Sequence, residues 1–181
     1  MLEQEVGEAL LASLLAVSSD GDPPARRAAS ALYAGLLILR ATTATMRGEL
    51  PAIAGLADVV ARYAERHGLA VTTEIDLDEG RLDREDRIAL VGIVCEAFEN
   101  AVRPGNACTV QVTAARGRNG IRMVIEDEDS GVTPADPEHA WGDLGIAGVE
   151  GLAVWRRGTV TLSASSGGGL RLEVALPGPP E

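Results

Sequence analysis

Three polar residues, Glu96, Asn100 and Arg103, follow one another at helical spacing within the segment "IVCEAFENAVRPG". Steps of three and four residues place side chains on one face of a helix. The amide oxygen of Asn100 is a hard ligand that suits Mg²⁺ carrying nucleotide phosphates, and the carboxylate of Glu96 can accept a proton. The same spacing also occurs on solvated helix faces, so the pattern by itself leaves both interpretations open.

A second candidate site lies in "VIEDEDSGV", where an apolar run ends at Asp127 and is followed by Asp129 and Gly131. An aspartate at the end of a strand is well placed to accept a hydrogen bond from an exocyclic amine such as that of adenine. The four consecutive acids would equally suit a solvated loop.

A third feature is the glycine spacing in "GDLGIAGVEGL", which contains Gly142, Gly145 and Gly148. Glycines before and inside the first turn of a helix let phosphates approach backbone N–H groups at its positive end. A glycine-rich turn is not specific by itself.

Residues 1–50 predict a helical hairpin. Val6, Leu10 and Leu14 recur at four-residue steps, "SSDGDPP" interrupts the pattern, and an alanine- and leucine-rich segment from residue 25 to about residue 50 predicts an antiparallel second helix. Two such helices carry more apolar surface than one hairpin can bury. We expect them to form a four-helix bundle with a second copy, giving a homodimer, or to pack on the rest of the chain.

Residues 51–181 predict a single α/β domain. The expected elements are a helix from Pro51 to Gly68, a strand over 69–77, a helix capped by Asp83, a hairpin over 110–125 with the turn "RGRNG", a short helix over 145–156 and a closing hairpin over 160–176. The buried stripe of the helix after Asp83 is predicted to be Ile88, Val91, Cys95, Phe98 and Val102. This order implies an α/β sandwich, a mixed sheet with helices on one face.

Composition narrows the classes of partner. A formal net charge of -11 disfavours nucleic acid. The apolar runs are too short to cross a membrane and the N-terminus carries acids, so the sequence predicts a cytoplasmic protein. Cys95 and Cys108 are expected to be buried thiols, and the distance in sequence between His67 and His139 disfavours a structural zinc site.

Taken in order, the three motifs resemble the ATP-binding domain of sensor histidine kinases, within the GHKL superfamily of Bergerat-type folds. "IVCEAFENAVRPG" is similar to the asparagine box of that family, "IEDEDSG" to its first glycine box, and "DLGIAGVEGL" with the closing hairpin to its second. The "LGIAGV" phrase is typical of the nitrate-sensor and thermosensor branch. The resemblance implies ATP and Mg²⁺ as cofactors.

The resemblance also implies roles for the motif residues. Asn100 would hold Mg²⁺, Glu96 would be the catalytic base, Asp127 would bind the adenine amine, Arg103 would belong to the cofactor-binding set, and Gly131, Gly145 and Gly148 would make room for the nucleotide. The sequence departs from the family pattern at Pro104, Asp129, Leu152 and Leu170.

The hairpin departs further, because Gly7 and Glu8 stand where the family has its phosphoacceptor histidine and the acid after it. The sequence thus predicts a histidine-kinase-like ATP-binding protein of a two-component system. It would be unable to phosphorylate itself on histidine and would act on or through a partner such as a response regulator; if active, it would be an ATP-dependent protein kinase. Two alternatives stay open: a nucleotide-free docking module, and an anti-sigma-type serine kinase.

Overall fold

The computed structural model describes residues 55–101, 109–128, 148–167 and 169–178, together with the isolated positions 28, 32, 35, 36, 39 and 146. The predicted hairpin over residues 1–50 lies outside this part of the chain, apart from five of the isolated positions, all of which are helical. The boundary between a hairpin and a domain near residue 50 stays a prediction.

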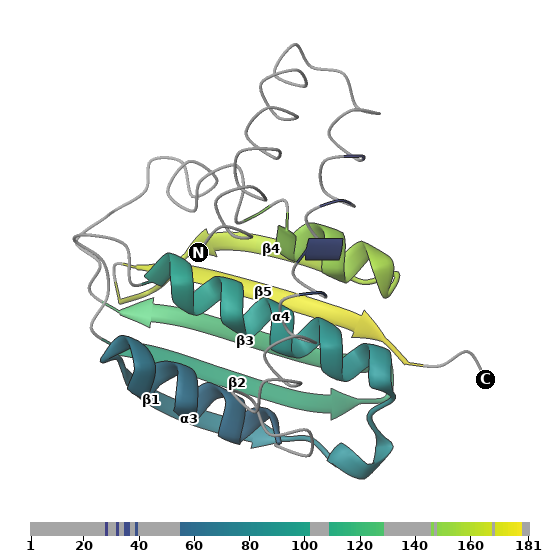
Figure 1. Ribbon diagram of the computed structural model, residues 1–181, viewed down its shortest axis with the longest axis horizontal. Coiled ribbons are helices and arrows are strands. Elements are labelled where there is room, and N and C mark those ends of the chain that lie inside the picture. The colour runs from purple at the N-terminus through teal and green to yellow at the C-terminus, as the bar shows by residue number, and fades with distance from the viewer. Residues whose placement is uncertain are drawn as a thin grey trace.

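One five-stranded mixed sheet forms the centre of the domain (Figure 1). The strands are β1 (Ala70–Asp76), β2 (Thr109–Gly117), β3 (Gly120–Glu128), β4 (Thr159–Ala164) and β5 (Leu170–Pro177), in the order β1-β2-β3-β5-β4. β1 runs parallel to β2, and the other neighbours are antiparallel. The helices α3 (Leu56–His67) and α4 (Arg84–Ala101) and a helical segment at 148–155 lie over one face of the sheet. The predicted α/β sandwich is confirmed.

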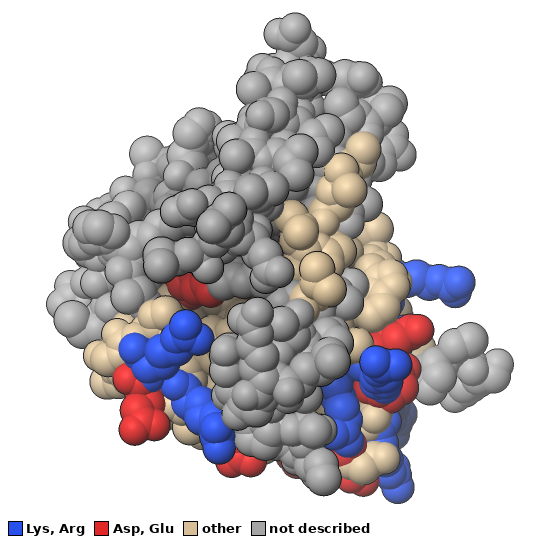
Figure 2. Space-filling view, in the orientation of Figure 1, with Lys and Arg blue, Asp and Glu red and all other residues tan. Residues whose placement is uncertain are grey.

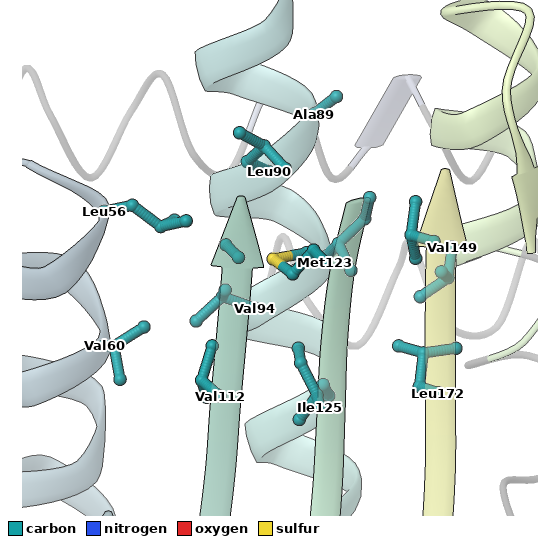
Figure 3. Close-up of a cluster of buried hydrophobic side chains, with 14 of the residues drawn as sticks. Leu56, Val60, Ala89, Leu90, Val94, Val112, Met123, Ile125, Val149 and Leu172 are labelled. Atoms are coloured by element: carbon teal, nitrogen blue, oxygen red, sulfur yellow. The ribbon is translucent and has the colours of Figure 1, made fainter. Parts of the chain in front are cut away.

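Apolar side chains alternate with more exposed ones along the strands, and this gives the sheet one buried face. In β2 and β5 every second side chain is buried, as the period of two in the sequence predicts. Figure 3 shows these side chains meeting those of the helices. The buried residues there include Leu56, Val60, Leu90, Val94, Val112, Met123, Ile125, Val149 and Leu172.

Helix α3 begins at Leu56, so the predicted start at Pro51 is wrong. Gly55 is extended, with φ -63° and ψ 160°, and no side chain of its own can cap the helix. Instead the Leu56 N–H donates to Oε1 of Glu79 at 2.6 Å, from a short 3-10 turn, η1 (Glu79–Arg81), that follows β1. This cap comes from 23 residues away, which local sequence cannot reveal. The helix ends at Gly68 as predicted, with φ 67°.

Helix α4 begins as predicted, with Asp83 accepting a hydrogen bond from the Asp86 N–H at 2.6 Å. The predicted stripe is only partly right. Cys95 and Phe98 are buried, but Ile88 and Val91 are half-buried. The buried apolar positions of α4 are Ala89, Leu90, Ile93, Val94, Cys95, Ala97, Phe98 and Ala101. Val102, the last residue of the predicted stripe, lies outside the described residues. α4 packs on the sheet between α3 and the 148–155 segment, so its buried surface is wider than one stripe.

The hairpin between β2 and β3 is tighter than predicted, because only Arg118 and Asn119 separate the strands. Gly120 has φ 127°, and a Cβ on it would lie 2.0 Å from the carbonyl oxygen of Leu176. Glycine is therefore required where the chain enters β3 beside the end of β5.

No helix among the described residues is long and apolar enough to span a membrane.

Candidate functional site

The second half of α4 carries the first candidate residues. Glu96 is 2% exposed. Asn100 follows one turn later within the same helix, and its side chain lies outside the described part of the chain. The helical spacing of the pair is confirmed, whereas a shared orientation toward a ligand stays a prediction.

Asp127 lies at the end of β3, as the sequence predicts, and is 7% exposed. The Leu170 N–H, at the start of β5, donates a hydrogen bond to its Oδ1 atom. Burial raises the pKa of the Asp127 carboxyl above its ordinary value, and the hydrogen bond from Leu170 partly offsets that shift. A buried carboxylate with one backbone donor is thus held at the end of the sheet.

Gly169 makes this arrangement possible. A Cβ on residue 169 would lie 2.0 Å from Oδ1 of Asp127 and 2.2 Å from its carbonyl oxygen. Both distances are far below van der Waals contact, so a side chain here would displace Asp127 or separate β5 from β3. The closing hairpin predicted over 160–176 turns at "SSGGG", residues 165–169, and this glycine run is the signal in the sequence that points to Gly169. The run predicts a turn and gives no indication of a contact with Asp127.

The remaining predicted residues divide into two groups. Gly148 lies in the helical segment 148–155 and is buried. Arg103, Gly131 and Gly145 lie outside the described residues.

Figure 1 shows the C-terminal end of α4, the tip of β3 and the start of β5 at the same end of the sheet. Tertiary structure therefore brings Asp127 and Gly169 together at the end of the sheet toward which the second half of α4, with Glu96, runs.

Charge on the described surface is mixed. Figure 2 shows arginine side chains beside acidic ones on the face that carries the helices. Arg156 contacts Asp83, Glu85 and Asp86, and Asp86 also pairs with Arg116. Within the described ranges no cluster of three His, Cys, Asp or Glu side chains could hold a metal ion.

Among curated proteins, the chain is 35% identical over 99 residues to the sensor-type histidine kinase PrrB of Mycobacterium tuberculosis, covering 48% of this chain and 22% of that protein. It is 27% identical over 113 residues to the signal transduction histidine-protein kinase/phosphatase UhpB of Salmonella typhimurium, covering 62% of this chain and 22% of UhpB. The chain therefore spans about a fifth of the length of these relatives. No protein-family model matches it.

Solved structures of histidine kinases are also similar to this chain. The ATP-binding domain of PrrB from Mycobacterium tuberculosis aligns with a TM-score of 0.52 and 29% identity, covering 70% of this chain and 96% of that domain. The blue-light activated histidine kinase of Erythrobacter litoralis aligns with a TM-score of 0.57 and 19% identity, covering 97% of this chain and 57% of that one. This is the fold of a histidine kinase ATP-binding domain.

Two departures from the histidine kinase pattern occupy the core of that fold. Leu152, where the family commonly has arginine, is 0% exposed, and Leu170, where a small hydroxyl residue is usual, is 8% exposed. Both side chains pack among apolar neighbours. At residue 170 the backbone N–H, and not a side-chain hydroxyl, meets Asp127. The finer assignment to the nitrate-sensor branch stays a prediction.

Proposed function

We propose that this chain is a histidine-kinase-like signalling protein of a two-component system that binds ATP with Mg²⁺. It would act on or through a partner without phosphorylating itself on histidine. The observation that carries the proposal is the buried Asp127 carboxylate at the end of β3. Its raised pKa shows that burial opposes its charge, and such positions are typical of functional sites. Similarity to the PrrB ATP-binding domain supports the same interpretation.

The residues present fit an adenine nucleotide. Oδ1 of Asp127 accepts from Leu170, so Oδ2 would accept from the adenine amine. Gly169 contributes no side chain beside that carboxylate. The two oxygens of Asp127 thus take separate donors, one from the protein and one from the base.

The phosphate end of the nucleotide would lie toward α4 and Gly148. Asn100 would supply an amide oxygen to Mg²⁺, which neutralises phosphate charge when bound. Mg²⁺ commonly takes only one or two protein ligands, so Asn100 would suffice as the protein's ligand to the ion. Glu96 would accept the proton of a nucleophile, if a phosphoryl group is transferred.

Calorimetric titration with ATP and ADP, with and without Mg²⁺, tests the proposal. Asn100→Ala should weaken Mg-ATP more than metal-free ATP, whereas Asp127→Asn should weaken both and relax the preference for adenine over guanine. Loss of one polar contact costs about 1 to 3 kcal/mol, or about 5- to 150-fold in affinity. Asp76→Asn, an exposed change at the end of β1, is the control and should leave affinity unchanged. If Asn100→Ala and Asp127→Asn each lower ATP affinity by the same factor with and without Mg²⁺, Asn100 is not the Mg²⁺ ligand and the proposed roles are wrong.

A second candidate, a nucleotide-free docking module, is favoured by one observation. Leu170 fills the start of β5 with a buried apolar side chain where the family usually has a hydroxyl group. The titration above separates the two candidates. A folded protein that shows no heat with either nucleotide would support the docking module.

We also propose that the chain forms a homodimer through residues 1–50. Two described leucines of the segment expected to form the second helix are exposed in the single chain, Leu32 at 53% and Leu39 at 62%. Leu36 lies one turn after Leu32 on the same helical face. Sedimentation should give a dimer that Leu36→Glu dissociates, because the carboxylate would be buried without a partner. A wild-type monomer at tens of micromolar would contradict this proposal.

A further inference from the structure

The 148–155 segment and α4 are in close contact at Gly92. Gly92 is a buried glycine in the middle of α4, and a Cβ on it would lie 2.8 Å from Cδ1 of Leu152. Ordinary carbon–carbon contact lies at about 3.5 to 4.0 Å. Glycine costs a helix interior stability relative to alanine, so its presence here calls for a local reason. The contact with Leu152 supplies one.

A second contact sets the direction of the segment. Arg156, just after the segment, donates to Oδ1 of Asp86 through Nε at 3.0 Å and Nη2 at 2.8 Å. Asp86 lies in the first turn of α4, whereas Gly92 lies further along that helix. Residues 156 and 152 thus meet residues 86 and 92 in order, so the segment runs antiparallel to α4, as Figure 1 shows.

This direction relates the contact to the proposed nucleotide site. Glu96 lies one turn beyond Gly92 along α4, and Gly148 lies one turn before Leu152 in the segment. Because the two elements are antiparallel, both steps lead toward the same end of the domain. The spacing at Gly92 therefore affects the spacing between Glu96 and Gly148.

We propose that Gly92 is a positioning residue for the phosphate end of the proposed nucleotide site. Its missing side chain lets the 148–155 segment lie close to α4, and Arg156 holds the segment at its other end. A Cβ at residue 92 would lie 2.8 Å from Cδ1 of Leu152, so either that side chain or the whole segment must shift. We expect the segment to move outward, because Leu152 is 0% exposed and packed in the core. This inference rests on the proposed function and adds a residue to it.

Gly92→Ala tests the inference when two ligands are compared. By calorimetry, the variant should bind Mg-ATP at least about fivefold more weakly, since displacements of about 1 Å have large effects on positioned groups. Adenosine has no phosphates and reaches only the Asp127 end, so its affinity should change less than twofold. A merely destabilised protein would lose both ligands alike or neither. Equal losses for Mg-ATP and adenosine, or no loss, would overturn the inference.

A rescue variant guards against misfolding. Leu152→Val removes Cδ1, the atom nearest to a Cβ at residue 92. In that background Gly92→Ala should leave Mg-ATP affinity within twofold and raise the melting temperature, because only the better helix propensity of alanine remains. In the wild-type background the same change should lower the melting temperature. If Gly92→Ala changes the melting temperature in the same direction in both backgrounds, the contact between residue 92 and Leu152 is not the cause of its effect, and the inference is overturned.

The outcomes also separate this inference from the proposed function. If wild-type protein binds neither ATP nor adenosine, the proposed function fails and the inference fails with it. If the wild type binds both ligands and Gly92→Ala binds them equally well, the inference alone fails.

Discussion

Gly169 lies against Asp127 so closely that a Cβ on residue 169 would be 2.0 Å from the carboxylate oxygen that accepts from Leu170. Gly169→Ala should therefore displace Asp127, lower the melting temperature and abolish detectable ATP binding. Gly117→Ala is the matched control, because a Cβ there would have no neighbour within 4 Å. Retained ATP affinity in Gly169→Ala would show that the Asp127 geometry is not needed for binding.

Asp127 should make stability depend on pH in a definite direction. Its folded-state pKa lies above the ordinary value of 3.8 because burial disfavours the charged carboxylate. The folded protein then holds this proton more tightly than the unfolded chain, so the free energy of unfolding falls as pH rises from 3.8 through the raised pKa. Above the raised pKa the whole of this loss is present.

Asp127→Asn cannot ionise and can still accept from the Leu170 N–H through its amide oxygen. The difference in melting temperature, variant minus wild type, should be more positive at neutral pH than at a pH below 3.8. Thermal unfolding at both pH values measures this, with Asp76→Asn as an exposed control. A difference between variant and wild type that does not change with pH would refute a raised pKa.

Arg157 is the one described residue other than glycine with a positive φ, 58°. It follows the 148–155 segment in a left-handed conformation, where its N–H bonds the Val154 carbonyl at 2.9 Å and the Gly158 N–H bonds the Ala153 carbonyl at 2.7 Å. Arg157→Gly should raise the free energy of unfolding by about 1 kcal/mol by relieving this strain. Gly68 holds the equivalent position after α3, with φ 67°. Gly68→Ala should lower stability by a similar amount, and denaturant titration compares the two.

Asp86 joins two arginines at the first turn of α4. It is 4% exposed and lies 2.8 Å from Nη2 of Arg156 and 3.3 Å from Nη2 of Arg116. Asp86→Asn keeps the shape but removes the charge that both guanidinium groups share, and should cost about 2 kcal/mol of unfolding free energy.

The matched control for Asp86 is an exposed ion pair. Arg81 lies 3.1 Å from Asp78, with side chains 79% and 63% exposed. Arg81→Gln should change stability by less than about 0.5 kcal/mol, because solvent screens such pairs. Equal effects of Asp86→Asn and Arg81→Gln in urea titrations would show that burial adds nothing to the Asp86 network.

Autophosphorylation on histidine should be absent. An acceptor must come within about 3 to 3.5 Å of the transferred phosphoryl group. The resemblance to histidine kinases implies that Gly7 stands at the position of the family's histidine, and glycine has no side chain to accept the group. His67 ends α3, where its ring stacks on Tyr63 with centroids 5.9 Å apart, so it would have to leave its helix to act as an acceptor. Incubation with γ-labelled ATP should give no acid-labile, base-stable label. Label that persists in His139→Ala would contradict the hairpin interpretation, and label lost in that variant would make His139 the acceptor.

The order and type of the helices and strands from α3 to β5 follow from local patterns in the sequence, although the 3-10 turn η1 was not predicted. Periods of two and of about 3.6 residues separate strands from helices, and local signals such as Asp83 before α4 and Gly68 after α3 mark their ends. The position of Asp127 at the end of β3 was predictable for the same reason, since alternation stops there. These features depend on neighbours within one or two turns of the chain.

Contacts between residues far apart in the sequence depend on the tertiary structure. Glu79 caps α3 from 23 positions away along the chain. Residue 169 must be glycine because the carboxylate of Asp127 occupies the space of a side chain. Gly92 of α4 contacts Leu152, which lies in the 148–155 segment. The α4 stripe was misjudged for the same reason, because packing on three sides buries residues that a single amphipathic helix would expose. Close contacts depend on distances between elements, and no periodicity within one element encodes those distances.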